Sequence, residues 1–384
     1  MIDDAKNFLK RCLEIYSPSG HEKEYSEFIA SYLKKHDFLV KFDEVGNILA
    51  EKGIGEPVLL LVSHLDTISG ELPVIEKDGK LYGRGAVDCK PSLAAMVYSM
   101  AHYDISQINA GKIIFGGIIR EEDSLIGINE FIKSKISPNY AIFGEPTKVN
   151  QICVGYKGRI CIGFRILTES GHVASSWQYI NAIEAGLEIW NVIKGVCWQL
   201  NEMYCPKESN LKYFNRIIPN LTVISGGVLT NCIPSECILQ VDIRFPPNIA
   251  AEFILENLRQ KIIDFKHVYE NQIEKKIQIQ EDISSLIEGF EVDGDNMIIG
   301  ALRWAIFNTC KEKPKLIKKT GTTFINMIGM HFGIPSITYG PGDPKLEHTD
   351  NEFIDIDEFL TSIEIYVKFF TKFFELYHNK AKKS

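Results

Sequence analysis

Hydrophobic positions recur in two different patterns along the 384-residue chain. In its first and last parts, short continuous apolar runs alternate with stretches of helical periodicity, which is typical of buried parallel strands and the helices that cover them. The predicted strands are Val58–Val62, Lys112–Ile119, Tyr140–Phe143 and Ser336–Tyr339, and the predicted helices are Asp3–Tyr16, Ser92–Tyr103, Ile126–Ser134, Met297–Asn308 and Asp357–Tyr377. This alternation predicts an α/β fold with a mostly parallel sheet flanked by helices.

A further helix is predicted to run toward Lys35. Ser19 and Glu22 have the spacing of a capping box, in which two side chains bond backbone N–H groups at the start of a helix. Turn-forming residues, among them Ser17 and Gly20, separate this helix from the preceding one.

The pattern changes in residues 157–282. Apolar and polar positions there alternate one by one around two helical stretches, which indicates half-buried antiparallel strands. The alternating runs are Arg159–Leu167, Asn220–Ser225 and Ile238–Phe245, and the helical stretches are Ile180–Gln199 and Ala251–Asp264. We therefore predict an α+β unit with an antiparallel sheet at 157–282, inserted into a larger unit formed by 1–156 and 283–384.

Composition and charge narrow the class of protein. With 45% hydrophobic and 24% charged residues, the chain has the composition of an ordinary folded protein. A formal net charge of −8 argues against a nucleic-acid partner, which needs a basic surface. The sequence shows no signal peptide and no apolar stretch of transmembrane length, so we expect no membrane partner. Nine cysteines without a CxxC pair fit a reducing compartment, and we expect a cytoplasmic protein.

Residues that commonly ligate metals follow each predicted buried strand. Each occurrence has an ordinary explanation on its own, because a His-x-Asp string arises by chance and a glutamate pair favours a helix start. In parallel sheets, however, the carboxyl ends of the strands meet at one edge, where ligands bind. The residues are His64 and Asp66 after the first strand, Glu121 and Glu122 after the second, Glu145 after the third, His348 beyond the fourth, and Asp88 in a glycine-containing turn before a helix.

A charge count favours two metal ions at this edge. The carboxylates of Asp88, Glu122 and Glu145 leave one positive charge on two divalent cations, and one hydroxide ion balances it. Neutral imidazoles of His64 and His348 complete a nitrogen and oxygen ligand set that suits Zn²⁺, with Co²⁺ or Mn²⁺ as possible substitutes. If Asp88 is shared, each metal has one histidine and one unshared glutamate.

Two acidic residues remain beside this ligand set. Glu121 is the natural general base, which deprotonates the attacking water and passes the proton to a leaving amine. Asp66 lies two residues beyond His64 and is placed to accept the far ring N–H, which fixes the imidazole tautomer.

The motifs resemble, in order and spacing, those of the M20 metallopeptidase/deacylase family. They are SHLDT (63–67), GRGAVDCK (83–90), REED (120–123), GEPT (144–147) and EHTDNE (347–352). The resemblance implies a two-zinc site with His64, Asp88, Glu122, Glu145 and His348 as ligands, Asp88 bridging. It also implies that Glu121 is the base, that Asp66 supports His64, and that residues 157–282 form a lid or dimerisation domain.

Further residues follow from the resemblance alone. SGHVASS (170–176) is similar to a family segment whose histidine reaches across a homodimer to the substrate carbonyl oxygen, which implies this role for His172. The segment 226–247 is similar to one that supplies an asparagine and an arginine to the substrate carboxylate, which points to Asn231 and Arg244. Thr322, in KKTGTTFIN, is a third implied substrate contact. The alternative for Arg244 is a solvated charge on a strand.

Within the family, the chain resembles the amino-group carrier protein lysine/ornithine hydrolases, relatives of acetylornithine deacetylase. The strings that carry this resemblance are SGELPV (69–74), LYGRGAVDCK (81–90), VGYKGR (154–159), KKTGTTFIN (318–326) and YGPGD (339–343). The resemblance implies release of lysine or ornithine from the terminal glutamate of a small acidic carrier protein, in lysine or arginine biosynthesis.

Two departures from the family pattern keep other substrates open. Pro91 and Ser92 replace a small glycine-containing pair, and 324–326, Phe-Ile-Asn, replaces a more usual Asp-Met-Asn that we place in the substrate pocket. The alternatives are a deacylase acting on acetylornithine, acetyl-lysine or succinyl-diaminopimelate, a dipeptidase, and a non-catalytic binding relative.

Overall fold

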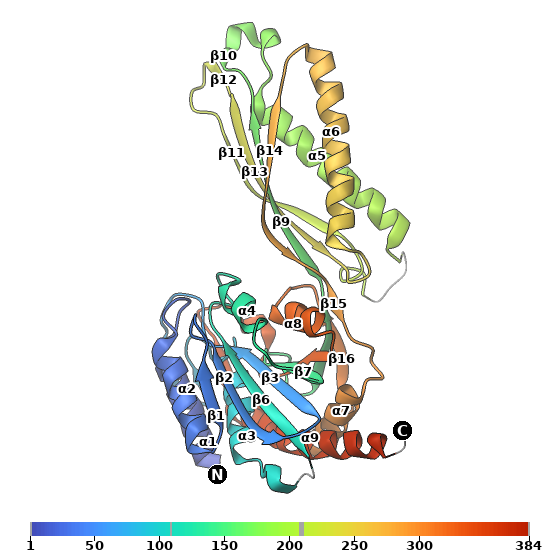
Figure 1. Cartoon of the computed structure of the whole chain (residues 1–384). Helices are drawn as coiled ribbons and strands as arrows, with labels where there is room; N and C mark the ends of the chain where they lie inside the picture. Colours follow the sequence, from blue (N-terminus) through green and yellow to red (C-terminus); the bar gives the residue numbers. More distant parts are fainter. Residues whose placement is uncertain (1, 108–109, 207–210, 383–384) are drawn as a thin grey trace. The chain divides into compact units, whose positions relative to one another are not determined.

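The computed structural model describes residues 2–107, 110–206 and 211–382, and it divides into two compact units (Figure 1). The first unit comprises Met1–Val154, Val292–Ile317 and Thr323–Ser384, and the second comprises Gly155–Glu291 and Lys318–Thr322. The lid or dimerisation role of residues 157–282 stays a prediction.

The first unit is built on a sheet with the strand order β1-β2-β6-β3-β7-β17-β8. Its central strands β6, β3, β7 and β17 are parallel, whereas the flanking strands β1, β2 and β8 are antiparallel to their neighbours. The mostly parallel α/β sheet is therefore confirmed. The strands are β1 (Leu39–Phe42), β2 (Ile48–Ile54), β3 (Val58–His64), β6 (Gly111–Ile118), β7 (Tyr140–Phe143), β8 (Gln151–Tyr156) and β17 (Ser336–Thr338); β16 (Lys315–Lys319) pairs with β8.

Helices cover both faces of this sheet. Leu59 and Leu61 of β3 join a core with helices α1, α2, α3, α7 and α9, while α4 and α8 pack on β6, β7 and β17 from the other face (Figure 1). Because both faces are covered, β3 is apolar at every position from Leu59 to Val62. The helices are α1 (Ile2–Glu14), α2 (Lys23–Lys35), α3 (Lys90–His102), α4 (Ile126–Phe131), α7 (Met297–Cys310), α8 (Phe324–Phe332) and α9 (Ile356–Ala381).

Smaller elements complete the first unit. Strands β18, β5 and β4 form a separate antiparallel sheet. Their bounds are β4 (Ile75–Lys77), β5 (Lys80–Tyr82) and β18 (Phe353–Asp355), and two short 3₁₀ helices are η1 (Ile105–Gln107) and η3 (Pro344–Leu346).

The second unit has an antiparallel sheet with the strand order β11-β13-β9-β14. Helices α5 and α6 share one apolar core with this sheet. The sequence did not predict β14, an edge strand whose side chains are mostly exposed and polar, so that its alternation is weak. The elements are β9 (Gly158–Leu167), β10 (Gly171–His172), η2 (Val173–Gln178), α5 (Ala182–Tyr204), β11 (Ile218–Gly226), β12 (Cys232–Ile233), β13 (Glu236–Phe245), α6 (Ala251–Ile273), β14 (Gln278–Ile287) and β15 (Phe290–Glu291).

The capping box predicted for α2 was wrong. Glu22 is the residue before the helix, but its side chain makes no capping hydrogen bond. Ser19 Oγ instead donates to Asp66, and the Glu22 carboxylate accepts from the backbone N–H groups of Gly20 and Arg120. Both side chains therefore bind the loops of the candidate site rather than their own helix.

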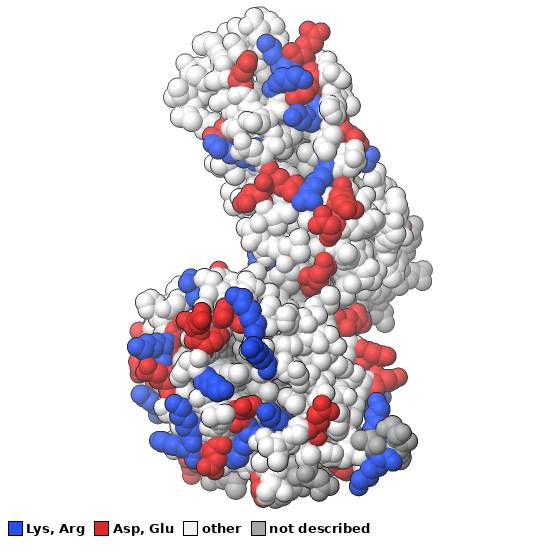
Figure 2. Space-filling view, viewed as in Figure 1, with Lys and Arg blue, Asp and Glu red and all other residues white. Residues whose placement is uncertain are grey.

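The apolarity of the helices and the distribution of surface charge concern the predicted absence of membrane and nucleic-acid partners. Among the described residues, no helix is long and apolar enough to cross a membrane. On the face drawn in Figure 2, basic and acidic side chains are interspersed on both units. The predicted absence of a nucleic-acid partner stays a prediction.

Candidate active site

The five predicted metal ligands come together in the first unit. His64 is the last residue of β3, and Glu122 and Glu145 follow the carboxyl ends of β6 and β7. These three strands are adjacent and parallel, so their ends meet at one edge of the sheet. Asp88 lies in the turn that leads into α3, and His348 lies in the loop after η3 with a left-handed backbone, φ 61°.

Asp88 is the centre of this arrangement. Its Oδ1 lies 3.1 Å from His64 Nε2, and its Oδ2 lies 3.1 Å from His348 Nε2. Glu145 Oε1 lies 3.6 Å from His64 Nε2, and Glu122 Oε1 lies 3.1 Å from His348 Nε2. The five side chains thus form one continuous series, in which each oxygen of Asp88 faces a different imidazole.

The donor set fits divalent metal ions. Two groups of closely spaced ligand atoms share Asp88: one holds His64 and Cys89, and the other holds Glu122 and His348. The Cys89 sulfur already lies 3.0 Å from Ser63 Oγ and donates to the backbone carbonyl of His64 at 3.4 Å. Glu145, which also contacts His64, is the better third donor of the first group. Imidazole nitrogens with carboxylate oxygens suit zinc and related metals.

When no metal is bound, the negative charges of the carboxylates are balanced by protons on the neighbouring histidines. Hydrogen bonds to Asp88 and Glu122 raise the pKa of His348 to about 10. Burial opposes ionisation of Asp88, but hydrogen bonds from His348 and His64 hold its pKa well below the ordinary value. A metal ion must therefore displace the proton of His348, so binding is expected to release protons.

Glu121 lies beside this ligand set. Thr323 Oγ1 donates a hydrogen bond of 2.9 Å to Glu121 Oε1 and lies 3.4 Å from Glu145 Oε1. Burial raises the pKa of Glu121 to about 7; His64 opposes this, and the charges of Glu122 and Asp88 reinforce it. A carboxyl group with a pKa near 7 exchanges protons readily at neutral pH, as a general base requires. Sequence reasoning named Thr322 and missed Thr323.

Asp66 supports both the histidine and the glutamate pair. Its backbone carbonyl oxygen lies 2.9 Å from His64 Nδ1, at the far side of the ring from Asp88, and its carboxylate Oδ1 lies 3.3 Å from the same nitrogen. The same carboxylate accepts the backbone N–H groups of Glu121 and Glu122 at 2.9 and 3.0 Å. Asp66 thus fixes the imidazole and the loop after β6 together.

Glu352 organises the turn that carries Asp88, and sequence reasoning gave it no role. This carboxylate accepts the backbone N–H groups of Gly85, Val87 and Asp88 at 2.9 to 3.0 Å, and it pairs with Arg84 at 3.3 Å. Its side chain is 1% exposed and that of Arg84 is 6% exposed. The only signal in the sequence was its place in the string EHTDNE.

In the second unit, His172 and Asn231 lie close together and exposed. His172 is paired with Cys232 across strands β10 and β12, and its Nδ1 accepts from the backbone N–H of Ala174. The carbonyl of Asn231 accepts from the backbone N–H of Val173. Both residues therefore lie at one end of the antiparallel sheet.

Arg244 and Thr322 form a second group in this unit. Arg244 Nη1 donates to Thr322 Oγ1 at 3.1 Å, and Arg244 Nε donates to Asp242 at 2.7 Å. Arg159 lies directly opposite Arg244 across β9 and β13 and also donates to Asp242, at 2.7 Å. Two guanidinium groups share one carboxylate, which leaves one net positive charge. Sequence reasoning missed Arg159 and Asp242.

The structure does not bring these two groups together within one chain. Arg244 lies near the carboxyl end of β13, whereas Asn231 precedes its first residue, Glu236. Eight residues of strand at about 3.4 Å each separate Glu236 from Arg244 by roughly 27 Å. His172 and Asn231 therefore do not contact the same small ligand as Arg244 of their own chain.

The departure at 324–326 lies at the start of helix α8. Phe324 and Ile325 are 2% and 1% exposed and pack inside the protein. Asn326 is fully buried and caps helix α8 together with Thr323. Their place in the substrate pocket stays a prediction.

Comparisons with known proteins agree with these motifs. Residues 60–372 match the sequence profile described as "Peptidase family M20/M25/M40". A LysW-lysine/LysW-ornithine hydrolase from Sulfurisphaera tokodaii is 32% identical over 364 residues, which cover 94% of this chain and 93% of that protein.

Solved structures show the same fold. A tripeptidase from Staphylococcus aureus superposes with a TM-score of 0.78 at 21% identity, covering 96% of this chain and 97% of the other. An M20 family metallo-carboxypeptidase from Sulfolobus solfataricus gives a TM-score of 0.77 at 16% identity, covering 97% and 99%.

Proposed function

The chain belongs to peptidase family M20/M25/M40, and on this basis we propose that it releases lysine or ornithine from the terminal glutamate of a small carrier protein. Family membership makes it a metal-dependent hydrolase. The finer proposal is supported by the relative from Sulfurisphaera tokodaii, whose name describes hydrolysis of LysW-lysine and LysW-ornithine and which this chain covers almost completely. A cytoplasmic location stays a prediction from the sequence.

We propose a site for two zinc ions, with cobalt as a substitute. His64, Glu145 and Asp88 are suited to hold one ion, and Asp88, Glu122 and His348 the other. The observation that carries this proposal is the position of Asp88, whose two carboxylate oxygens each lie 3.1 Å from a different histidine. When bound, such ions polarise a carbonyl group and lower the pKa of water.

Glu121 is the proposed general base. It takes a proton from the water that attacks the amide carbonyl carbon. As the C–N bond breaks, Glu121 gives this proton to the leaving nitrogen, so the products are a carboxylate and a free amino acid. Thr323 holds the Glu121 carboxylate by a hydrogen bond of 2.9 Å, and Asp66 keeps its backbone in place.

Arg244 and Thr322 are proposed to bind a carboxylate of the substrate. With Arg159 and Asp242, they form a group that carries one net positive charge and lies only partly buried. The proposed substrate carries a free carboxylate on the released amino acid and another on the terminal glutamate. A guanidinium pair is therefore a suitable partner for it.

We also propose a homodimer, in which His172 and Asn231 serve the site of the partner subunit. Their separation from Arg244 within one chain supports this arrangement. Strand β11 forms one edge of its sheet, and residues 217–235 contain no charged side chain. Uncharged edge strands pair readily with another chain, whereas proteins usually protect free edges with charges.

The substrate test compares a carrier protein that bears lysine on the γ-carboxyl group of its terminal glutamate with a panel of small amides. The panel contains N-acetyl-ornithine, N-acetyl-lysine, N-succinyl-diaminopimelate and dipeptides, and released amino acid is measured by mass spectrometry with zinc or cobalt present. We expect the carrier to be cleaved with the highest kcat/KM. Higher kcat/KM on a member of the panel would identify a small-molecule deacylase or dipeptidase instead.

Glu121→Gln is the control in the same assay. It keeps the size and the hydrogen bond from Thr323 but cannot accept the proton, so we expect kcat to fall about 10²–10⁴-fold with metal content unchanged. Removal of metal with a chelator should abolish turnover, and added zinc should restore it. Normal metal binding with no hydrolysis of any substrate would indicate a binding relative.

A further inference from the structure

Three consecutive backbone N–H groups hold the loop that carries the proposed base and one proposed metal ligand. Arg120, Glu121 and Glu122 donate to carboxylate oxygens at 3.1, 2.9 and 3.0 Å. The bonds from Glu121 and Glu122 go to Asp66, which the motif SHLDT (63–67) already identified as part of the site. The first goes to Glu22, which belongs to the segment between α1 and α2.

Arg120 needs such an anchor. Its φ of 57° is in the left-handed region, which is unfavourable for any residue with a side chain unless the surroundings hold it. The Arg120 side chain pairs with Asp123, three residues later in the same loop, at 2.6 Å. Among the described residues, the Arg120 backbone N–H donates its hydrogen bond to Glu22.

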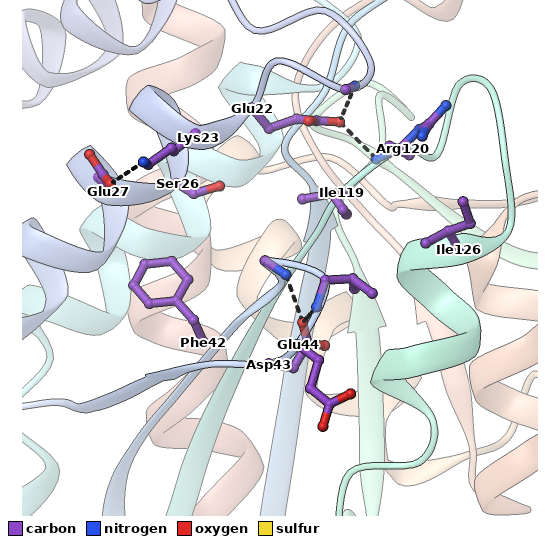
Figure 3. Close-up of a pocket in the computed structure, with 13 residues that line it drawn as sticks. Glu22, Lys23, Ser26, Glu27, Phe42, Asp43, Glu44, Ile119, Arg120 and Ile126 are labelled. Carbon is purple, nitrogen blue, oxygen red and sulfur yellow. Dashed lines mark hydrogen bonds and ion pairs between the residues drawn. The ribbon is translucent and has the colours of Figure 1, made fainter.

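The Glu22 side chain is committed to this loop. Its Oε1 accepts both from Arg120 and from Gly20, the latter at 2.9 Å (Figure 3). Although Glu22 precedes α2, its carboxylate does not cap that helix. Helix initiation therefore does not explain the choice of glutamate at this position.

Burial of this carboxylate is unfavourable in itself. Glu22 is 4% exposed, and within the described part of the chain it takes part in no ion pair. Burial, together with the nearby charge of Asp66, raises its pKa. A buried acid among other acids lowers stability, so an apolar residue would serve packing better.

The same segment is attached to the site at a second point. Ser19 Oγ donates to Asp66 Oδ2 at 2.7 Å, and the Ser19 N–H donates to the carbonyl of Thr67. The segment Ser19–Glu22 thus contacts both the loop after β3 and the loop after β6. A cavity of about 650 Å³ lies beside it, lined by Glu22, Glu27 and Arg120 among others (Figure 3).

We propose that Glu22 is a positioning residue: it holds the Arg120 backbone and thereby sets the orientation of Glu121 and Glu122. The inference rests on the roles proposed above for these two glutamates. It does not depend on which amide the enzyme cleaves.

The test separates the hydrogen-bond acceptor from the charge. Glu22→Gln keeps a carbonyl oxygen for both N–H groups, whereas Glu22→Met keeps the volume and removes the acceptor. We expect Glu22→Met to lower kcat at least tenfold with KM changed less than twofold, and Glu22→Gln to stay within threefold of wild type. Glu22→Ala, which removes the acceptor without adding bulk, is measured beside them. Any amide that wild type cleaves serves as the substrate.

Glu27→Gln is the matched control. Glu27 lines the same cavity and lies on α2, but its side chain is 60% exposed and its ion pair is with Lys23. This variant should leave kcat and KM unchanged.

Hydrogen exchange in the metal-free protein gives a readout that needs no substrate. In Glu22→Met and Glu22→Ala, the amides of Arg120–Glu122 should exchange at least tenfold faster than in wild type and Glu22→Gln, with α2 unchanged. The inference is overturned if the acceptor-free variants keep kcat within threefold, if Glu22→Gln loses as much activity as Glu22→Met, or if exchange rises in α2 instead of the loop. Failure to cleave the carrier substrate would count against the proposed function only.

Discussion

Side chains of the same type behave differently in this site because their neighbours differ. Glu121, partly buried and close to other acids, has a pKa raised to about 7. Asp88, equally enclosed but bonded by two imidazoles, stays ionised. Their contacts therefore separate the pKa values of the two acids: Glu121 can accept a proton, whereas Asp88 stays charged and can bind cations.

The protonation of His348 makes the stability of the metal-free protein depend on pH. Its folded-state pKa of about 10 exceeds the ordinary value of 6.5, so its contribution is fully present below pH 6.5 and is lost as pH rises toward 10. We expect His348→Asn to be less stable than wild type at pH 6.5, with a difference that shrinks by pH 10. Thermal melting of both proteins in chelator, at matched ionic strength, measures this.

A constant difference between the two melting temperatures across this range would show that His348 is neutral in the metal-free protein. His331→Asn provides the control, because this histidine lies outside the site, in the last turn of α8. Its substitution should give no such pH dependence.

At the scale of elements, the loops of the site are ordered by residues from other segments. The turn before α3 contains Asp88, yet its backbone N–H groups are held by Glu352, more than 260 residues later in the chain. Similarly, Thr323 holds Glu121 over a separation of 202 residues. Loops with these partners are fixed by the fold as a whole rather than by their own sequence.

Loss of Glu352 should unfold this turn. Glu352→Leu removes the buried carboxylate that pairs with Arg84, which keeps only its hydrogen bonds to the carbonyls of Gly70 and Thr349 and a longer ion pair with Asp350. We expect the free energy of unfolding to fall by about 3–5 kcal/mol and the metal content to fall as well. Urea denaturation and metal analysis measure the two effects. The double variant Arg84→Met/Glu352→Leu should regain part of the stability but not the metal, because the N–H groups of the turn stay unbound. Unchanged metal content in Glu352→Leu would exclude an organising role.

At the scale of the whole molecule, the two units carry different parts of the proposed function. The first contains the complete proposed metal site and base, and the second contains two separate groups of substrate-type residues. In the arrangement that we propose, a second chain supplies His172 and Asn231 to the site of the first unit.

Charge on the edge of the second unit should dissociate the proposed dimer. Val223 of β11 is 47% exposed, and Val223→Lys places a cation on that edge. We expect light scattering to show a monomer, with kcat reduced at least tenfold. Leu286→Lys is the matched control, because Leu286 is 41% exposed on β14, the opposite edge of the same sheet. A monomeric wild type, or a monomeric variant with full activity, would contradict the proposal.

The sequence by itself determined the parallel sheet and the positions of the proposed ligands. Buried strands are read from local apolar runs, and His64, Glu122 and Glu145 stand immediately after such runs, so adjacency in the chain was enough to place them. The antiparallel strands β9 and β13 were likewise evident from their alternation, whereas the exposed edge strand β14 was not.

Only the tertiary structure decided what holds the site in shape. Ser19 and Glu22 have the spacing of a helix cap, but their side chains form hydrogen bonds with distant loops instead. Glu352 and Thr323 form hydrogen bonds with residues that lie far away in the chain. The partner of Arg159 lies on a neighbouring strand, and no local pattern in the sequence predicts how the two strands are aligned. Hydrogen bonds of this kind depend on which segments the folded core brings side by side, and that information is spread over the whole sequence.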